Sequence, residues 1–118
     1  EIQNLTKSFS GTQVLKGISL KVRTGRTRVI LGLSGSGKSV LMKHMIGLMR
    51  PDSGSIIVDG VDLTAVSGNQ LLDVRRKFGM VFQQAALFDS MTVWENVAFR
   101  LLHEQHLSRS AAREMAVV

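Results

Sequence analysis

The stretch GLSGSGKS, residues 32–39, holds the residue types that bind phosphate in proteins. It matches the pattern G-x-x-x-x-G-K-[ST] at every fixed position. Its glycines can adopt backbone angles that a Cβ forbids, so that successive N–H groups turn inward around an anion. Lys38 can reach the terminal phosphates of a nucleotide, and the hydroxyl of Ser39 can bind Mg²⁺.

The sequence on either side of this stretch suits a loop between a strand and a helix. RVILGL, residues 28–33, is an apolar run expected to form a strand buried on both faces. Residues 38–48 are expected to form a helix, because apolar residues recur at helical spacing. The positive end of its dipole would attract phosphate. The residues expected to hold a nucleotide here are Gly32, Ser34, Gly35, Ser36, Gly37, Lys38, Ser39 and Val40.

Two other phosphate- or metal-binding patterns are weaker. A dinucleotide fingerprint built on the same glycines would need Gly or Ala at position 40, where Val40 stands. SIIVD, residues 55–59, imitates a strand that ends in a Mg²⁺-binding aspartate. Gly60 after Asp59 indicates a turn instead, and no Glu follows to act as a base. A glycine-rich turn without a ligand is the remaining alternative for the loop, and the strand–loop–helix context argues against it.

The composition is that of one globular domain. The chain has 118 residues, 44% of them hydrophobic, which is enough to bury a core. The absence of cysteine excludes disulfides and thiolate metal sites. No apolar run approaches the ~20 residues of a membrane-spanning helix. The chain begins at Glu1 and ends at Val118 inside a helical pattern, so we expect a fragment of a longer protein.

The formal net charge of +6 leaves two interpretations open, a solvated basic surface and a nucleic-acid-binding face. The lysines and arginines are scattered and have no interleaved aromatic residues, which favours the solvated surface. His44, His103 and His106 have no other metal-ligating residues near them, and we expect all three on the surface.

Strands and helices mixed along the chain predict an α/β fold with a partly antiparallel sheet. The expected strands span residues 1–9, 14–22, 28–33, 55–63 and 78–83, with turns at 10–12 and 59–60. The expected helices span residues 38–48, 67–77 and 93–102, with a last one from Ser108 or Ser110. Two of these helices open with capping-box pairs, Ser67 with Gln70 and Thr92 with Glu95.

Over nearly its whole length, the chain resembles the nucleotide-binding domain of ABC ATPases. Besides the loop, four stretches carry the resemblance: LTKSFSGTQVLKGISLKV (5–22), GLMRPDSGSIIVDGVDL (47–63), GMVFQQ (79–84) and ALFDSMTVWENV (86–97). It implies a P-loop NTPase fold of the ABC type, truncated before the signature and Walker B segments. Within residues 1–118, it implies a strand-rich core with Walker A over 1–85. The exit from the Q-loop and the start of the helical subdomain would occupy 86–118.

The resemblance implies roles for three residues outside the loop. Phe9 stands where the family carries an aromatic residue that stacks on adenine. The alternative is that Phe9 is an aromatic residue of the core. Val14 would touch the base or ribose, or be a plain strand residue. Gln83 stands at the Q-loop glutamine, whose side-chain oxygen would contact Mg²⁺ or the attacking water; the alternative is an exposed polar residue at a strand end. Lys38 and Gln83 are thus the expected catalytic residues, and Ser39 and Gln83 the expected Mg²⁺ ligands.

The resemblance also implies partners. ATP and Mg²⁺ would be the cofactors, a second ATP-binding subunit would complete the site, and residues 86–93 would contact a transmembrane permease. No nucleic acid is expected. No LSGGQ signature, Walker B pair or switch histidine is found before Val118. We therefore expect this chain alone to bind Mg-ATP without hydrolysing it, and the full-length dimer to be an ATPase at the cytoplasmic face of the inner membrane.

Residues 32–63 resemble the Mla-type group of bacterial ABC ATPases, which is linked to phospholipid traffic and solvent tolerance. Amino-acid importers share most of these residues. A non-transport ABC ATPase of DNA repair or translation, or another P-loop enzyme such as a kinase or GTPase, stays open as an alternative. The transported molecule and the direction of transport do not follow from the sequence.

Overall fold

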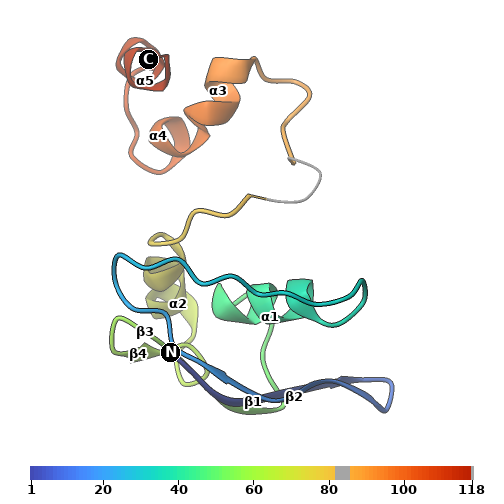
Figure 1. Ribbon diagram of the computed structural model, residues 1–118. Helices are drawn as coiled ribbons and strands as arrows, with labels where there is room; N and C mark the ends of the chain where they lie inside the picture. Colours follow the sequence, from blue (N-terminus) through green and yellow to red (C-terminus); the bar gives the residue numbers. More distant parts are fainter. Residues whose placement is uncertain (82–85, 118) are drawn as a thin grey trace. The chain divides into compact units, whose positions relative to one another are not determined.

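The computed structural model describes residues 1–81 and 86–117. The chain divides into two compact units (Figure 1). Unit 1 spans Glu1–Gly79 and unit 2 spans Met80–Val118. Unit 1 is an α/β structure that carries the predicted phosphate loop, and the described part of unit 2 is helical.

Unit 1 is built on a four-stranded antiparallel sheet in the order β2-β1-β3-β4. The strands are β1 (Ile2–Phe9), β2 (Thr12–Leu20), β3 (Ser53–Val58) and β4 (Val61–Asp62). Ser10 and Gly11 join β1 to β2, with φ of 47° and 80°, and Asp59 and Gly60 join β3 to β4, with φ of 47° and 79°. Both predicted turns are confirmed, and Asp59 lies in a turn as expected.

A bulge in β2 changes which of its side chains face the core. The register with β1 shifts by one residue between Ile18 and Lys16, and Gly17 is left bulged with φ of 75°. Leu15 is therefore buried although it lies three residues from Ile18. Half-buried and exposed side chains alternate from Ile18 to the end of the strand, but Val22, past its end, is 42% exposed.

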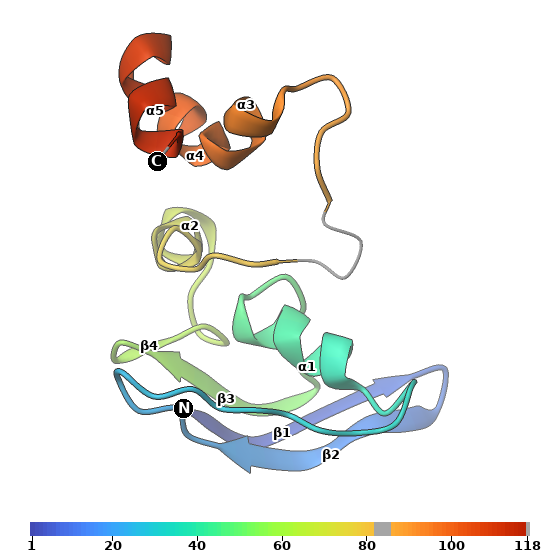
Figure 2. The ribbon, with the colours of Figure 1, turned by 45° about the horizontal axis from the view of Figure 1, so that its top comes forward.

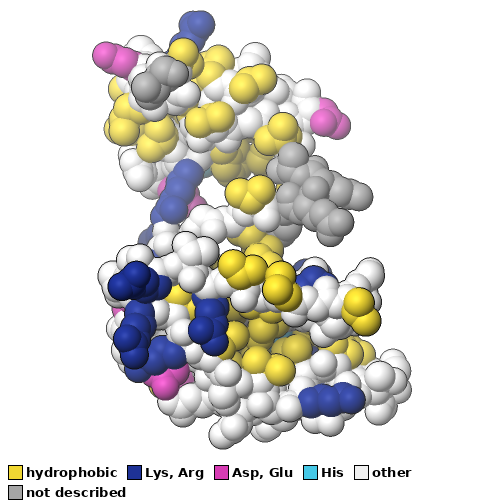
Figure 3. All heavy atoms as spheres, viewed as in Figure 1, with side chains coloured by type: hydrophobic (Ala, Val, Ile, Leu, Met, Phe, Trp, Pro, Cys, Tyr) yellow, Lys and Arg dark blue, Asp and Glu magenta, His cyan; other side chains and the backbone are white. Residues whose placement is uncertain are grey.

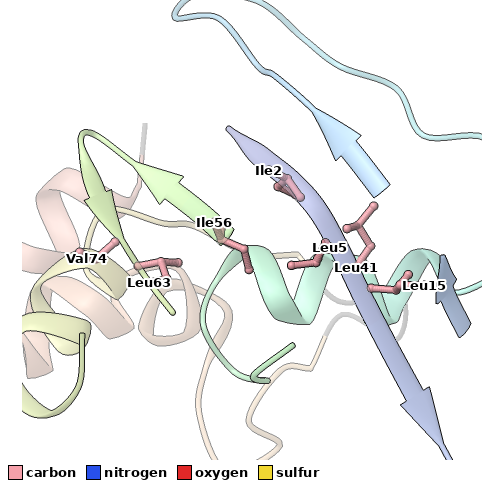
Figure 4. Close-up of a cluster of buried hydrophobic side chains, with 7 residues drawn as sticks. All are labelled: Ile2, Leu5, Leu15, Leu41, Ile56, Leu63 and Val74. Atoms are coloured by element: carbon pink, nitrogen blue, oxygen red, sulfur yellow. The ribbon is translucent and has the colours of Figure 1, made fainter. Parts of the chain in front are cut away.

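Helix α1 (Lys38–Met45) lies across one face of the sheet (Figure 2). Its Leu41 meets strand residues in a buried cluster (Figure 4), where each such side chain contributes about 1.5–3 kcal/mol through burial. The cluster consists of Ile2, Leu5, Leu15, Leu41, Ile56, Leu63 and Val74. This packing fixes α1, and with it the end of the phosphate loop, to the sheet.

The C-terminal end of α1 differs from the prediction in two ways. The helix ends at Met45, because Gly47 turns left-handed with φ of 70° and its N–H donates to the carbonyl of His44 at 2.9 Å. His44 was predicted on the surface, but it is fully buried. It lies three residues after Leu41, close to one helical turn, and so shares the face that packs on the sheet.

Helix α2 (Gly68–Arg75) follows β4. Ser67 is its N-cap residue, but the Ser67 side chain makes no capping hydrogen bond to the described residues. The first helical residue has a φ of 57°, which turns the backbone out of the geometry that a capping box needs. The predicted capping box with Gln70 is therefore wrong. The guanidinium of Arg75, at the end of α2, donates a hydrogen bond to the carbonyl of Gly47, which follows α1.

Two predicted strands do not form in the part of the chain that the structure describes. Residues 28–33 and 78–81 pair with no described strand, and residues 82–83 lie outside the described range. A strand needs a neighbour for its N–H and C=O groups, whatever its apolar content. The exposed apolar side chains of these runs are Val29, Leu31, Leu33 and Val81.

The helices described in unit 2 are α3 (Val93–Val97), α4 (Phe99–His103) and α5 (Arg109–Ala116). The capping box of Thr92 and Glu95 is confirmed. The single helix predicted over 93–102 is divided at Ala98, a buried residue with ψ of 0°. The Ser108 side chain accepts an N–H of the first turn of α5, which confirms this start. None of the helices in the described part of the chain has the length and apolar composition of a membrane span.

Asn96 shapes the loop that precedes α3. Its Nδ2 donates to the carbonyls of Phe88, Met91 and Thr92 at 3.2, 3.2 and 3.0 Å, and its Oδ1 accepts the N–H of Phe88 at 2.8 Å. The ring of Phe88 stacks on Phe99 with centroids 4.8 Å apart. One amide side chain thus sets the backbone of a surface segment that has no regular structure of its own.

Candidate phosphate-binding site

The predicted phosphate loop, residues 32–39, ends at the N-terminus of α1. Gly37 is the N-cap residue, with φ of 93° and ψ of 5°, and its carbonyl accepts the first hydrogen bond of the helix at 2.8 Å. The N–H of Ser36 donates to the carbonyl of Leu33 at 3.2 Å, and Gly35 within this turn has φ of 77°. Two left-handed glycines therefore shape the loop, as the sequence predicts.

The first turn of α1 offers unsatisfied donors. The first N–H groups of an α-helix have no acceptor within the helix. No side chain of the described residues caps α1, and its first turn contains no acidic residue. Lys38, Ser39 and Val40, all predicted to contact the nucleotide, occupy this turn. Their backbone N–H groups and the helix dipole together favour an anion.

Lys38 folds back over its own loop. Its Nζ donates to the carbonyls of Gly32 and Leu33 at 2.7 and 2.6 Å and lies 3.5 Å from Oγ of Ser36. These acceptors are neutral, and among the described residues no carboxylate pairs with this ammonium. A phosphate oxygen carries negative charge that a carbonyl oxygen lacks, so it attracts the ammonium more strongly. A phosphate at the loop would therefore compete well for Lys38.

The loop hydroxyls are open to a ligand. Ser34, Ser36 and Ser39 are all exposed. Ser39 lies in the first turn of α1, directly after Lys38. A hydroxyl oxygen at this place suits Mg²⁺, which prefers oxygen ligands and keeps several of its waters.

Strand β2 packs against the end of the phosphate loop at Gly37. A Cβ added to Gly37 would lie 2.9 Å from Cγ1 of Val14 and 3.3 Å from Cδ2 of Leu15. Gly37 is thus needed for space as well as for its left-handed backbone. A Cβ on Gly32 would come closest to the Oγ of Ser36, at 2.5 Å, and that side chain can rotate away. The contact at Gly37 could not be predicted from the sequence, because it depends on how β2 packs against α1.

The residues predicted for the base have different surroundings. Val14 is half-buried and lies against the N-cap of α1, next to the loop. Phe9 ends β1, is 41% exposed, and has the ammonium of Lys7 5.7 Å from its ring centroid. Its ring therefore has surface available for stacking.

Gln83 and its neighbour Gln84 lie outside the described residues, so the predicted roles of Gln83 in catalysis and metal binding stay predictions. Outside residues 82–85 and 118, no three His, Asp or Glu side chains gather into a metal site. His103 and His106 are exposed, as predicted.

The charge around the loop has one sign. From residue 2 to residue 51, every charged side chain is a lysine or an arginine. Asp52, which ends this stretch, is bonded to Lys7 at 2.8 Å and to the N–H of Ser8 at 2.7 Å. The Lys7 ammonium, and then the Ser8 N–H, lower the pKa of the Asp52 carboxyl. The potential near the loop therefore favours anions.

Comparison with known proteins places this geometry among ATP-binding subunits. The family model described as ABC transporter matches residues 15–117. The "probable ribonucleotide transport ATP-binding protein mkl" of Mycobacterium tuberculosis is 41% identical over 117 residues, 99% of this chain and 33% of that protein. The "intermembrane phospholipid transport system ATP-binding protein MlaF" of Haemophilus influenzae is 34% identical over 118 residues, 100% of this chain and 45% of that protein.

A solved structure also matches the fold. It is a dimeric ATP-binding cassette in a post-hydrolysis state, bound to ADP and Pi, with a TM-score of 0.88 and 30% sequence identity. The match covers 98% of this chain and 53% of that one. This chain thus spans about half of the solved cassette and 33% and 45% of the two relatives.

Proposed function

The chain belongs to the ABC transporter family, and from this premise we propose that it binds Mg-ATP as the ATP-binding part of a transporter. The observation that carries the proposal is the loop at residues 32–39. It ends in the left-handed Gly37, leads into a first helical turn that no described side chain caps, and holds the ammonium of Lys38 on neutral carbonyls. Gly37 also packs closely against Val14 of β2, which supports the proposal because this packing fixes the backbone that would face the phosphate.

Each residue then has a role toward the nucleotide. The loop N–H groups would bind phosphate oxygens, and Lys38 would exchange its two carbonyl acceptors for β- and γ-phosphate oxygens. Ser39 would ligate Mg²⁺ together with Gln83, and Phe9 would stack on the base beside Val14. When bound, Mg²⁺ neutralises the charge that develops on the phosphates.

Hydrolysis and coupling would need partners. We propose that a second ATP-binding subunit completes the site. The dimeric state of the solved relative supports this proposal. We also propose that residues 86–93 contact a transmembrane permease, which would hold the protein at the cytoplasmic face of the membrane. The apolar side chains there are available: Leu87, Phe88 and Val93 are 63%, 49% and 81% exposed.

For the cargo, we propose a phospholipid. Residues 32–63 resemble the Mla-type group, and the relative from Haemophilus influenzae, named for phospholipid transport, is similar over 100% of this chain. The name of the mycobacterial relative mentions a ribonucleotide instead. A transport assay in reconstituted vesicles should therefore offer both kinds of cargo.

ATP affinity of the Lys38→Ala variant tests the proposal. Each hydrogen bond to a charged group is worth about 1.5–3 kcal/mol, so losing two weakens ATP binding by roughly a hundredfold or more. Lys43→Ala is the matched control, because Lys43 lies on the same helix and is exposed. Titration calorimetry with Mg-ATP measures both variants. Unchanged affinity in Lys38→Ala would contradict phosphate binding at this loop.

A further inference from the structure

A second cationic site lies in the segment that joins β2 to the phosphate loop. Six residues between 21 and 28 line a hollow of 540 Å³ that shares no residue with the loop at 32–39. Dark blue lysine and arginine side chains gather on this side of unit 1 (Figure 3). We call it the basic hollow, and its lining residues are Lys21, Val22, Arg23, Arg26, Thr27 and Arg28.

A tight turn makes the segment concave. The N–H of Arg26 donates to the carbonyl of Arg23 at 3.0 Å, and Gly25 between them has φ of 70°. The turn folds the chain back, so that the cations before it and after it line the same hollow. The backbone thereby holds several positive side chains near one another. An anion bound in the hollow would offset the electrostatic repulsion between them.

The positive charge of the basic hollow is largely unpaired. Lys21 pairs with Glu1 at 3.1 Å. Arg23, Arg26 and Arg28 are exposed, and within residues 1–81 and 86–117 none of the three forms an ion pair. Three guanidinium groups are therefore available to a ligand.

The chemistry of the lining selects the ligand. A guanidinium presents a planar fork of donors that matches two oxygens of a phosphate. The volume of 540 Å³ suits a small polar group, since ligand pockets span roughly 300–1,000 Å³. No aromatic residue lines the hollow, so there is no platform on which nucleobases would stack. These features favour clustered phosphates over a nucleic-acid strand.

We propose that the basic hollow binds two neighbouring phosphate groups of one molecule, independently of the phosphate loop. Two sources present this chemistry, a soluble pyrophosphate group and the headgroup of a lipid with two phosphates. The test therefore uses two probes, inorganic pyrophosphate in titration calorimetry, and phosphatidylcholine vesicles with or without cardiolipin in co-sedimentation. Both are applied to the purified protein carrying Lys38→Ala, so that the loop does not bind the probe.

The decisive comparison is between two double variants that remove the same charge. One combines Arg23→Gln with Arg26→Gln, and the control combines Lys16→Gln with Lys43→Gln, both at exposed positions outside the hollow. Removing two charge-assisted contacts should weaken binding of the active probe by roughly tenfold or more, while the lysine pair changes it by about twofold or less. The single variant Arg28→Gln repeats the test with a minimal change.

Each outcome decides something. Binding of pyrophosphate alone identifies a soluble ligand, and binding of cardiolipin vesicles alone identifies a lipid headgroup; either supports the site. No binding of either probe, or an equal loss in the lysine pair, overturns it. Mg-ATP affinity is measured separately with Lys38 intact. If the arginine pair abolishes that affinity, the hollow is not independent of the loop. Unchanged ATP affinity in Lys38→Ala contradicts only the proposed ATP site, because the arginine and lysine pairs are compared with each other in one background.

Discussion

The Cγ1 atom of Val14 lies 2.9 Å from the position that a Cβ on Gly37 would take. This contact joins β2 to the N-cap of α1, two elements separated in sequence by a long irregular segment. The shape of the phosphate loop therefore depends on a strand that contains none of its residues.

The Gly37→Ala variant should lose both stability and ATP affinity. A left-handed backbone costs a non-glycine residue about 1–2 kcal/mol, and overpacking against Val14 adds about 1–3 kcal/mol. Gly60→Ala is the matched control, because Gly60 has φ of 79° and nothing within 4 Å of an added Cβ. It should show the backbone cost alone and keep ATP affinity. Urea denaturation and calorimetry measure the two effects, and equal destabilisation of both variants would refute the packing argument.

The features predicted from the sequence are those that neighbouring residues determine. The left-handed glycines of the loop, the turn at Asp59 and the capping box of Thr92 with Glu95 each depend on a few adjacent residues. Their physical causes, backbone freedom and side-chain capping, act within one turn of chain. For that reason the centre of the candidate site could be found without a structure.

The features that the sequence did not predict depend on tertiary contacts. RVILGL at 28–33 has the composition of a buried strand, but a strand also needs a paired neighbour, and it has none among the described residues. His44 is polar, yet its place one turn after Leu41 puts it in the core. The support of Gly37 by Val14 requires knowing the bulge and packing of β2.

Replacing His44 by leucine should preserve or raise stability. The imidazole is fully buried, and its Nδ1–H donates to the carbonyl of Val40 at 2.7 Å. Its Nε2 is buried without a hydrogen-bond partner among the described residues, and an unsatisfied buried polar atom costs about 1–3 kcal/mol. Leucine keeps most of the volume and removes that atom. His44→Ala, which leaves a cavity, should instead cost about 2–4 kcal/mol in urea denaturation. A His44→Leu variant as unstable as His44→Ala would show that the imidazole itself is required.

Asn96→Asp should loosen the segment before α3. The aspartate keeps an acceptor for the N–H of Phe88, but it loses the donors that bind the carbonyls of Phe88, Met91 and Thr92. Each hydrogen bond contributes about 1 kcal/mol net to stability, so the free energy of unfolding should fall by roughly 2–3 kcal/mol. Hydrogen exchange of amides 88–92 should accelerate. Gln105→Glu, the same chemical change at an exposed position of unit 2, should leave exchange there as it is.

The stability of unit 2 should depend on the ionisation of Glu95. The Thr92 hydroxyl donates to its Oε2 at 2.7 Å and the Thr92 N–H at 2.8 Å, and Arg109 pairs with the other oxygen. These contacts, the Thr92 hydroxyl first, lower the pKa of Glu95 from 4.5 to about 2. Since the pKa is lower in the folded state, the stabilisation is complete above pH 4.5 and disappears as the pH falls toward about 2.

Glu95→Gln tests this pH dependence directly. At neutral pH the variant should melt at a lower temperature than the wild type, because glutamine lacks the charge that strengthens the contacts with Thr92 and Arg109. Near pH 2 the two proteins should melt together, because the wild-type carboxyl is then becoming protonated. Glu104→Gln is the control: its partner Arg100 lies 2.9 Å away in an exposed pair, which solvent screens, so it should change little at either pH. A difference between Glu95→Gln and wild type that stays constant from pH 7 to pH 2 would mean that shape, and not charge, holds the start of α3.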